Sequence, residues 1–338
     1  MKYFIITYGC QMNKSDSERI ASILEKKGYK PAKNIEAAGL ILVNMCSVRQ
    51  SAVNRVYGLI EKIKKLDKKK IKTILTGCVL GRDKPKFSKK FDQILKFDDL
   101  SKIKPKRQDK SVAYIPISNG CNNTCSYCAV PYTRGRLVCR NHKDIIKETK
   151  ESIKKGFKEI WLLGQNVNNY QSPANSIINF SKLLKMISSL PGIFTIHFIS
   201  PHPKDFTNEL INIMAGSKKI AKYLNLPVQS GDNKILKKMN RPYTVERYKN
   251  LVEKIRKEMP DINLSTDVIV GFPGETIKQF ENTVKLFKEL KFNMAYVSKF
   301  SPRPGTPAAK LKDDIPYREK QRRWKILNDI ILNKKYNE

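Results

Sequence analysis

The sequence has few of the residues that mark secreted, membrane-spanning or zinc-finger proteins. Its 338 residues include only 3 His and 2 Trp, and its 31 Asp and Glu residues are outnumbered by 66 Lys and Arg. No apolar run is long enough to cross a membrane, and residues 1–8 form a short strand-like segment rather than a signal peptide. These absences predict a cytoplasmic protein whose 7 cysteines are ligands or buried thiols, because that compartment keeps thiols reduced.

The excess of basic residues indicates a polyanionic partner. The formal net charge is +35, and nucleic acid is the commonest partner of so basic a chain. An A/T-rich genome also enriches lysine, so composition by itself leaves RNA binding open. Binding through charge alone is sensitive to salt and only weakly specific for sequence.

The first hundred residues alternate strands with helices. Apolar runs and helical spacing predict strands over 3–8, 40–44 and 71–76, and helices over 15–27 and 53–66. The first helix is expected to open at a capping box, the S-D-S-E of residues 15–18. Alternation of this kind predicts a parallel sheet with helices packed on it.

Each of these three strands leads directly into a cysteine, namely Cys10, Cys46 or Cys78. Parallel strands finish on one edge of a sheet, where open α/β folds collect their ligands, so we expect the three thiols to converge. Gly9 and Gly77 precede two of them and leave room for a bulky inorganic group. Ordinary buried cysteines are the alternative, but matched positions after three strands favour a three-cysteine site.

The polar, basic segment 100–111 lacks periodicity and is the predicted domain boundary. Beyond it, six strand and helix units indicate a partial barrel, and Pro and Gly gather just after the strands, on the rim where barrels place active sites. The predicted strands lie near 113–118, 158–163, 193–199, 222–226, 263–270 and 293–300.

A second set of three thiols follows the first of these strands, in the string GCNNTCSYC of residues 120–128. Cys121, Cys125 and Cys128 have the spacing C-x3-C-x2-C, with Tyr127 before the last. Three thiolates can hold three irons of a [4Fe-4S] cluster and leave the fourth iron open to a ligand. A zinc site is the alternative, but the chain has no second C-x2-C-type knuckle. The spacing is similar to the signature of radical S-adenosylmethionine (SAM) enzymes.

Seven strings spread over nearly the whole chain extend this likeness. Together they resemble the methylthiotransferase family of radical SAM enzymes, and within it the MiaB-type enzymes that act on tRNA. The strings are TYGCQMN (7–13), NMCSVR (44–49), GCNNTCSYCAVPYTRG (120–135), LLGQNVN (162–168), LPVQSG (226–231), DVIVGFPGET (267–276) and SPRPGTPAA (301–309).

The resemblance implies an α/β fold: an N-terminal parallel-sheet α/β domain (1–108) and a partial (β/α)6 radical SAM barrel (109–338). It implies two [4Fe-4S] clusters and SAM as cofactors. An auxiliary cluster would be held by Cys10, Cys46 and Cys78, and the SAM-cleaving cluster by Cys121, Cys125 and Cys128. One SAM would methylate a sulfur on the auxiliary cluster. A second would yield a deoxyadenosyl radical, which abstracts hydrogen from an unreactive carbon so that the methylthio group can be added there.

Further positions are expected to contact SAM, by resemblance and by their place on the rim. Loop structure is the alternative for Gln165, Asn166, Asp267 and Glu275. Arg134 is a candidate for the SAM carboxylate, an RNA phosphate or a solvated surface. Cys139 is expected to be a bystander thiol. The expected SAM contacts are Tyr127, Gly164, Gln165, Asn166, Asp267 and Glu275.

The implied reaction adds a methylthio group to carbon 2 of isopentenyl-modified adenosine 37, with the tRNA anticodon stem-loop as partner and flavodoxin or ferredoxin as a candidate electron donor. The sulfur donor is left open. Relatives that act on threonylcarbamoyl-adenosine or on a ribosomal-protein aspartate are the alternative, and a non-enzymatic iron-sulfur protein that binds RNA is the alternative of another class. Family members usually end in a TRAM-type β-barrel, whereas this sequence ends in a basic helical segment, 316–335.

Overall fold

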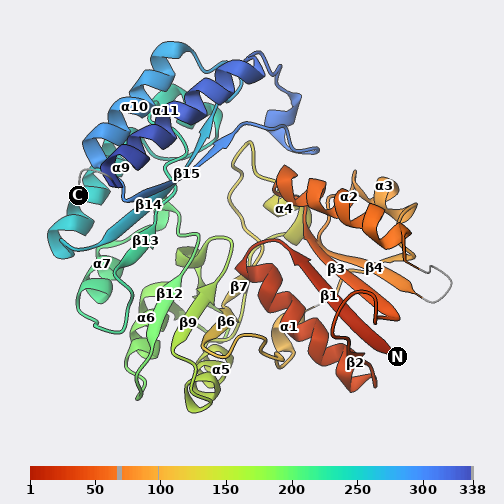
Figure 1. Cartoon of the computed structure of the whole chain (residues 1–338). Coiled ribbons are helices and arrows are strands. Elements are labelled where there is room, and N and C mark those ends of the chain that lie inside the picture. Colours follow the sequence, from red (N-terminus) through yellow and green to blue (C-terminus); the bar gives the residue numbers. More distant parts are fainter. Residues whose placement is uncertain (67–70, 98, 336–338) are drawn as a thin grey trace.

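The computed structural model describes residues 1–66, 71–97 and 99–335, which form two α/β parts lying side by side (Figure 1). The N-terminal part is a five-stranded sheet of order β2-β1-β3-β4-β5, and all its neighbouring strands are parallel. Its elements are β1 (Lys2–Tyr8), α1 (Gln11–Lys26), β2 (Lys30–Pro31), β3 (Leu40–Cys46), α2 (Gln50–Lys64), β4 (Lys72–Cys78), α3 (Lys84–Ser88) and β5 (Gln93–Ile94).

Helices cover both faces of this sheet. The α1 side is packed by Ile20, Leu24 and Leu42, and the α2 side by Val56 and Ile60 among others. The central strand β3 is buried along its whole length, as expected for a parallel strand covered on both faces. The predicted parallel sheet is confirmed, and β2 and β5 add two short strands that the sequence did not reveal.

Helix α1 begins earlier than predicted. Cys10 is its N-cap, and the Cys10 N–H donates to Asn13 Oδ1 at 3.3 Å. The expected capping box is wrong because its side chains make tertiary contacts instead. Ser15 Oγ donates to the Tyr114 carbonyl at 3.2 Å, and Glu18 accepts from Arg107 at 2.8 Å.

The second part is a partial barrel of six parallel strands, as predicted. Two three-stranded sheets, β12-β9-β6 and β13-β14-β15, are joined by a parallel bridge between Ile196 and Ile220. The strands are β6 (Val112–Pro116), β9 (Glu159–Leu163), β12 (Thr195–Phe198), β13 (Tyr223–Asn225), β14 (Asn263–Val270) and β15 (Met294–Lys299).

Helices lie on the outer side of this barrel and close one large apolar core (Figure 1). Among the described residues, no helix has the length and apolarity needed to cross a membrane. The main helices are α5 (His142–Lys154), α6 (Phe180–Ser188), α7 (Asn208–Ala215), α8 (Asn233–Lys238), α9 (Val245–Glu258), α10 (Ile277–Leu290) and α11 (Tyr317–Lys335).

Short elements decorate the rim and the connection between the two parts. The 3₁₀ turn η1 (Leu100–Lys102) lies in the connection, and α4 (Val130–Arg134) follows the C-x3-C-x2-C loop and contacts β4 of the N-terminal sheet. The others are β7 (Ser118–Asn119), β8 (Val138–Cys139), η2 (Val167–Asn169), β10 (Gln171–Ser172), β11 (Asn175–Asn179), η3 (Pro203–Asp205) and η4 (Pro307–Lys310).

Candidate active site

The structure brings Cys10, Cys46 and Cys78 to one edge of the N-terminal sheet. Cys46 and Cys78 end β3 and β4 and are partners in register, while Cys10 follows β1 on the other side of β3. A hydrogen bond between the Cys46 and Cys78 thiols lowers the pKa of Cys46 to about 7, although burial and the nearby Cys10 oppose this shift. We call these residues the N-terminal trio.

A close backbone approach supports the N-terminal trio. Gly77 has φ +100°, and a Cβ there would lie 2.3 Å from both Asn44 Oδ1 and the Met45 carbonyl oxygen, so only glycine fits. Asn44 is buried and donates from Nδ2 to the Asn13 carbonyl at 2.9 Å, while Asn13 Nδ2 donates to Asn44 Oδ1 at 2.9 Å. This asparagine pair ties the start of α1 to β3. Asn13 and Asn44 both lie in the motif strings, but nothing in the sequence indicated that they contact each other.

Cys121, Cys125 and Cys128 lie on the loop between β7 and α4, and we call them the loop trio. The Cys128 N–H donates to the Cys125 carbonyl at 3.0 Å. Gly120, at φ +79°, turns the chain into the loop, and its N–H donates to Gln165 Oε1 at 2.6 Å. Burial, with the neighbouring thiols adding to it, raises the pKa of Cys128 to about 12.

Arg241 is a buried cation beside the loop trio that sequence reasoning missed. Its Nη1 lies 3.5 Å from Cys125 Sγ, and its Nη2 donates to the Pro227 carbonyl at 2.9 Å. Nε donates to the Tyr243 hydroxyl at 2.8 Å. These contacts fix the guanidinium beside the Cys125 sulfur.

Arg134, at the end of α4, connects the two trios. Its Nε donates to Cys78 Sγ at 3.0 Å, its Nη2 to Asp16 Oδ2 at 2.7 Å and its Nη1 to Asn119 Oδ1 at 3.0 Å. The side chain thus reaches from the helix that follows Cys128 to the N-terminal trio. Arg134 is therefore not a solvated surface arginine, and its contact with a thiol was not among the alternatives expected from the sequence.

A second arginine joins the N-terminal trio to the barrel rim. Arg303, in the loop after β15, is 6% exposed and donates to the Ser47 carbonyl next to Cys46, and to Gln50 Oε1. Asp267 on β14 also lies near Arg49, whose charge opposes the rise in the Asp267 pKa that burial causes. The N-terminal trio therefore lies over the open side of the barrel.

The rim residues predicted to contact SAM differ in burial and in their hydrogen-bond partners. Gly164 approaches β7 so closely that a Cβ would lie 2.6 Å from Ser118 Oγ. Asn166 is 1% exposed; its Nδ2 donates to Asp205 Oδ2 at 2.9 Å, and its Oδ1 has no partner among the described residues. Tyr127 packs against the cluster that contains Phe272.

Glu275 is already engaged by the protein. Its carboxylate accepts from the Gly271 N–H and from Arg323 Nη1 on α11, both at 2.7 Å. His202 on the same rim is buried, which lowers its pKa to about 2, with Arg241 and Lys204 adding to the effect. His202 is therefore neutral, and its Nε2 has no partner among the described residues.

All seven cysteines are free thiols, which suits both trios as thiolate ligands. Among the described residues, no group of three or more His, Cys, Asp or Glu gathers around a single metal-ion position. Cluster ligands each bind a different iron. Two sets of three free thiols, with guanidinium groups beside Cys78 and Cys125, are the donor type and number that would fit one [4Fe-4S] cluster each. Cys139 pairs with Ser118 in β8–β7 and belongs to neither trio.

Two family models match the chain in the same two regions. The radical SAM superfamily matches residues 115–287, and the family described as Uncharacterized protein family UPF0004 matches residues 2–97. Among solved structures, the radical SAM methyltransferase TsrM from Kitasatospora setae is similar in fold, with a TM-score of 0.63 and 15% identity over 91% of this chain and 75% of that one.

Curated relatives give the sharper comparison. The tRNA-2-methylthio-N(6)-dimethylallyladenosine synthase of Carboxydothermus hydrogenoformans is 39% identical over 99% of this chain and 85% of the relative. The enzyme of the same name from Dictyoglomus thermophilum is 41% identical over 96% of this chain and 80% of the relative. The chain therefore belongs to the radical SAM superfamily and, within it, to the family of tRNA-2-methylthio-N(6)-dimethylallyladenosine synthases.

Proposed function

We propose that this protein is an enzyme that adds a methylthio group to carbon 2 of isopentenyl-modified adenosine 37 in tRNA. The observation that carries the proposal is the contact of Arg134 with Cys78 Sγ at 3.0 Å, which holds the N-terminal trio against the helix that follows the loop trio. A reaction that moves sulfur from one cluster to a carbon activated at another requires the two sites to be adjacent. The relatives named above support the substrate.

Each trio would hold one [4Fe-4S] cluster, and SAM would bind at the open iron of the cluster on Cys121, Cys125 and Cys128. When bound, these groups supply the radical chemistry and the transferable sulfur that side chains cannot provide. The chain would hold both trios in place beside one another. Arg134 and Arg241 place positive charge beside one cysteine of each trio. At Cys78 this charge opposes the rise in pKa that the hydrogen bond with Cys46 and burial cause.

The rim residues would position SAM. We assign contacts with its polar groups to Tyr127, Asn166 and Asp267, of which Asn166 has an unpartnered buried oxygen among the described residues. Gly164 and Gln165 act indirectly. Gly164 lets β7 approach, and the Gln165 side-chain oxygen accepts from the Gly120 N–H and so holds Gly120 next to the loop trio.

Glu275 would contribute to the SAM site through Gly271. Arg323 and the Gly271 N–H occupy its carboxylate, so it shapes the loop that ends β14.

The partners follow from charge and chemistry. A net charge of +35 suits the phosphates of a tRNA anticodon stem-loop, whose unstacked bases can be splayed into a pocket. Reduction of the SAM-cleaving cluster needs an electron donor, for which flavodoxin or ferredoxin is our candidate. We assign the activity to the cytoplasm, and the free thiols and the tRNA substrate support this assignment.

The test is mass spectrometry of tRNA nucleosides from cells that lack their own methylthiotransferase and express this chain. Methylthio-isopentenyladenosine should appear. If a methylthio group appears on threonylcarbamoyl-adenosine instead, or on a ribosomal-protein aspartate, the substrate assignment is wrong and the reaction class stands. If the purified protein carries two clusters but no methylthio product forms, the proposed function fails.

Cysteine variants separate the two sites. Cys10→Ala should still produce deoxyadenosine from SAM but install no sulfur, whereas Cys121→Ala should lose both. Cys139→Ser is the matched control, because Cys139 lies outside both trios, and it should retain both activities. Loss of SAM cleavage in a folded Cys10→Ala protein would contradict two separable clusters.

A further inference from the structure

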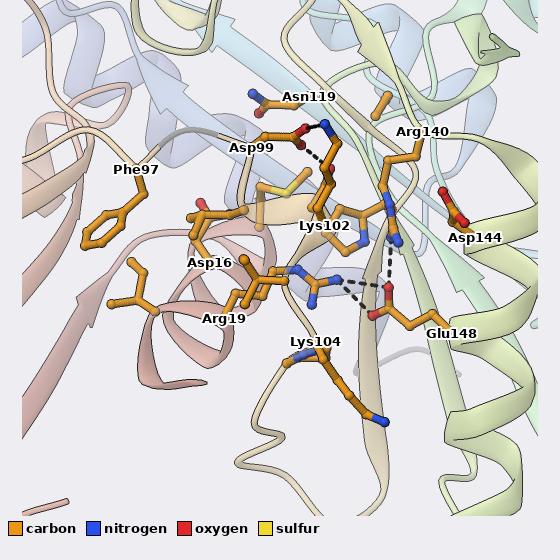
Figure 2. Close-up of a pocket in the computed structure, with 18 of the residues that line it drawn as sticks. Asp16, Arg19, Phe97, Asp99, Lys102, Lys104, Asn119, Arg140, Asp144 and Glu148 are labelled. Atoms are coloured by element: carbon orange, nitrogen blue, oxygen red, sulfur yellow. Dashed lines mark hydrogen bonds and ion pairs between the residues drawn. The ribbon is translucent and has the colours of Figure 1, made fainter. Parts of the chain in front are cut away.

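A cavity of about 990 Å³ lies between the N-terminal sheet and the barrel, apart from the six trio cysteines (Figure 2). It is bounded by α1, by the connection that contains η1, and by α5. Basic side chains outnumber acidic ones in its lining. A cavity of this size and polarity at a domain interface is a candidate ligand site.

The cavity borders a buried cluster of charges with an excess of positive charge. Glu148 accepts from three arginines: from Arg19 Nη2 at 2.8 and 3.1 Å, from Arg107 Nη2 at 2.8 Å and from Arg140 Nη1 at 2.9 Å. Figure 2 shows Arg19 and Arg140 converging on this carboxylate. Glu18, which accepts from Arg107, is the second acid, so three guanidinium groups face two carboxylates.

Arg19 has donors that the protein does not use. Its side chain is 0% exposed and lines the cavity, yet Nε and Nη1 have no hydrogen-bond partner among the described residues. Burying a charged donor without a partner is costly. Unused N–H groups in a cluster with excess positive charge indicate that an anion completes this site.

The far wall of the cavity reaches the N-terminal trio. Thr76, Gly77 and Arg134 line it, and Arg134 donates to Cys78 Sγ at 3.0 Å. The Arg134 side chain therefore separates the cavity from Cys78. An anion that enters beside Arg19 is drawn by the charge of Arg134 toward the edge where the N-terminal trio lies.

We propose that this cavity binds hydrosulfide, the anionic form of inorganic sulfide, and is the entry site for the sulfur that the enzyme transfers. The assignment rests on the proposed function, which consumes a sulfur atom at the N-terminal trio. Hydrosulfide is a small anion that accepts hydrogen bonds from guanidinium groups. Phosphate shares the negative charge, and the experiment separates the two anions.

The direct test is anomalous X-ray diffraction from crystals of the anaerobically prepared holoprotein soaked with hydroselenide, whose selenium scatters anomalously. A selenium peak beside Arg19, retained when phosphate is present in excess, is expected. Absence of a peak in the cavity overturns the proposal. A peak that phosphate abolishes makes the cavity a general anion site and overturns the assignment to sulfide.

A second test measures how the methylthio product depends on sulfide concentration. Arg19→Gln should raise the half-maximal sulfide concentration by roughly tenfold. Because Arg19 is fully buried and its loss weakens the fold, Lys147→Gln on the exposed lip of the cavity provides the second variant. It should raise the half-maximal sulfide concentration by a smaller factor. Lys150→Gln, exposed on the same helix outside the lining, is the matched control and should change nothing.

Deoxyadenosine formation should be unchanged in Lys147→Gln. An unaltered sulfide dependence in both folded variants overturns the proposal. If the unmodified protein forms no methylthio product at any sulfide concentration, the proposed function fails, and the selenium peak alone decides whether the cavity binds the anion.

Discussion

Arg134 combines three contacts that lie far apart in the sequence, to Asp16, Cys78 and Asn119. A guanidinium that donates to a ligand sulfur stabilises the more negative, reduced form of a cluster and so raises its reduction potential. We expect Arg134→Met to lower the potential of the cluster on the N-terminal trio and to leave the cluster on the loop trio unchanged.

An EPR-monitored redox titration of the reconstituted protein would measure both potentials. Arg136→Met changes an exposed arginine two residues away and serves as the control. Equal potentials in the Arg134 variant and the unmodified protein would contradict a role for this side chain at Cys78.

His202 gives a pH-dependent contribution to stability. Its folded-state pKa is lowered to about 2 from its usual 6.5, mainly by burial, so the unfolded chain takes up a proton below pH 6.5 that the folded protein does not. The free energy of unfolding should fall as pH drops below 6.5, by at most about 1.4 kcal/mol per pH unit from this group. In His202→Asn, urea unfolding between pH 7.5 and 5.5 should have a shallower pH slope; an unchanged slope would contradict the buried neutral imidazole.

At this scale the sequence predicted residues that lie in motif strings, Arg134 among them, but not the contacts that join distant parts of the chain. The six trio cysteines stand in recognisable spacings or at strand ends. Arg134 and Arg241 reach thiols 56 and 116 positions away, and no local pattern records such a contact. Their roles depend on how the barrel closes against the N-terminal sheet.

At the scale of elements, the end of β4 depends on Gly77. A Cβ at this position would overlap Asn44 Oδ1 and the Met45 carbonyl, and φ +100° disfavours any other residue. Gly77→Ala should therefore displace Cys78 and lose the cluster on the N-terminal trio. Iron per chain after reconstitution should fall from about eight to about four.

Gly81→Ala is the matched control for this change, because nothing lies within 4 Å of the added Cβ. It should bind the full complement of iron. A Gly77→Ala protein that also binds the full complement would show that the close approach is not needed for the site.

The barrel strands were predicted to within two residues at each end because apolar runs bounded by Pro and Gly mark them. The two-residue strands β2 and β5 are too short to produce such a pattern. The start of α1 was misplaced because Ser15 and Glu18 imitate a cap while contacting Tyr114 and Arg107. The Ser and Glu residues that are typical of a helix N-terminus can therefore instead make contacts between the two parts of the chain.

At the scale of the whole molecule, Glu148 ties the two parts together. Although burial opposes the shift, the three arginines hold the pKa of this carboxyl below its usual 4.5. Its contribution to stability is therefore fully present above pH 4.5 and is lost as pH falls through the lower folded-state pKa. Glu148→Ala leaves the arginines without their shared partner and should destabilise the protein by about 3–5 kcal/mol.

Urea unfolding at neutral pH would measure this loss. Glu151→Ala, on the same helix, removes a partly exposed pair with Lys104 and should cost less than about 1 kcal/mol. A similar decrease in the free energy of unfolding in both variants would contradict a larger contribution of Glu148 to stability. No sequence pattern predicted this cluster, because its charged residues resemble those of a solvated surface until the two parts of the chain pack together.

The length of α4 limits insertions and deletions between Cys128 and Arg134. Cys128 lies just before this five-residue helix and Arg134 ends it, so the helix works as a fixed spacer between a ligand of one trio and a contact to the other. Insertion or deletion of a single residue would rotate Arg134 by about 100° around the helix and away from Cys78.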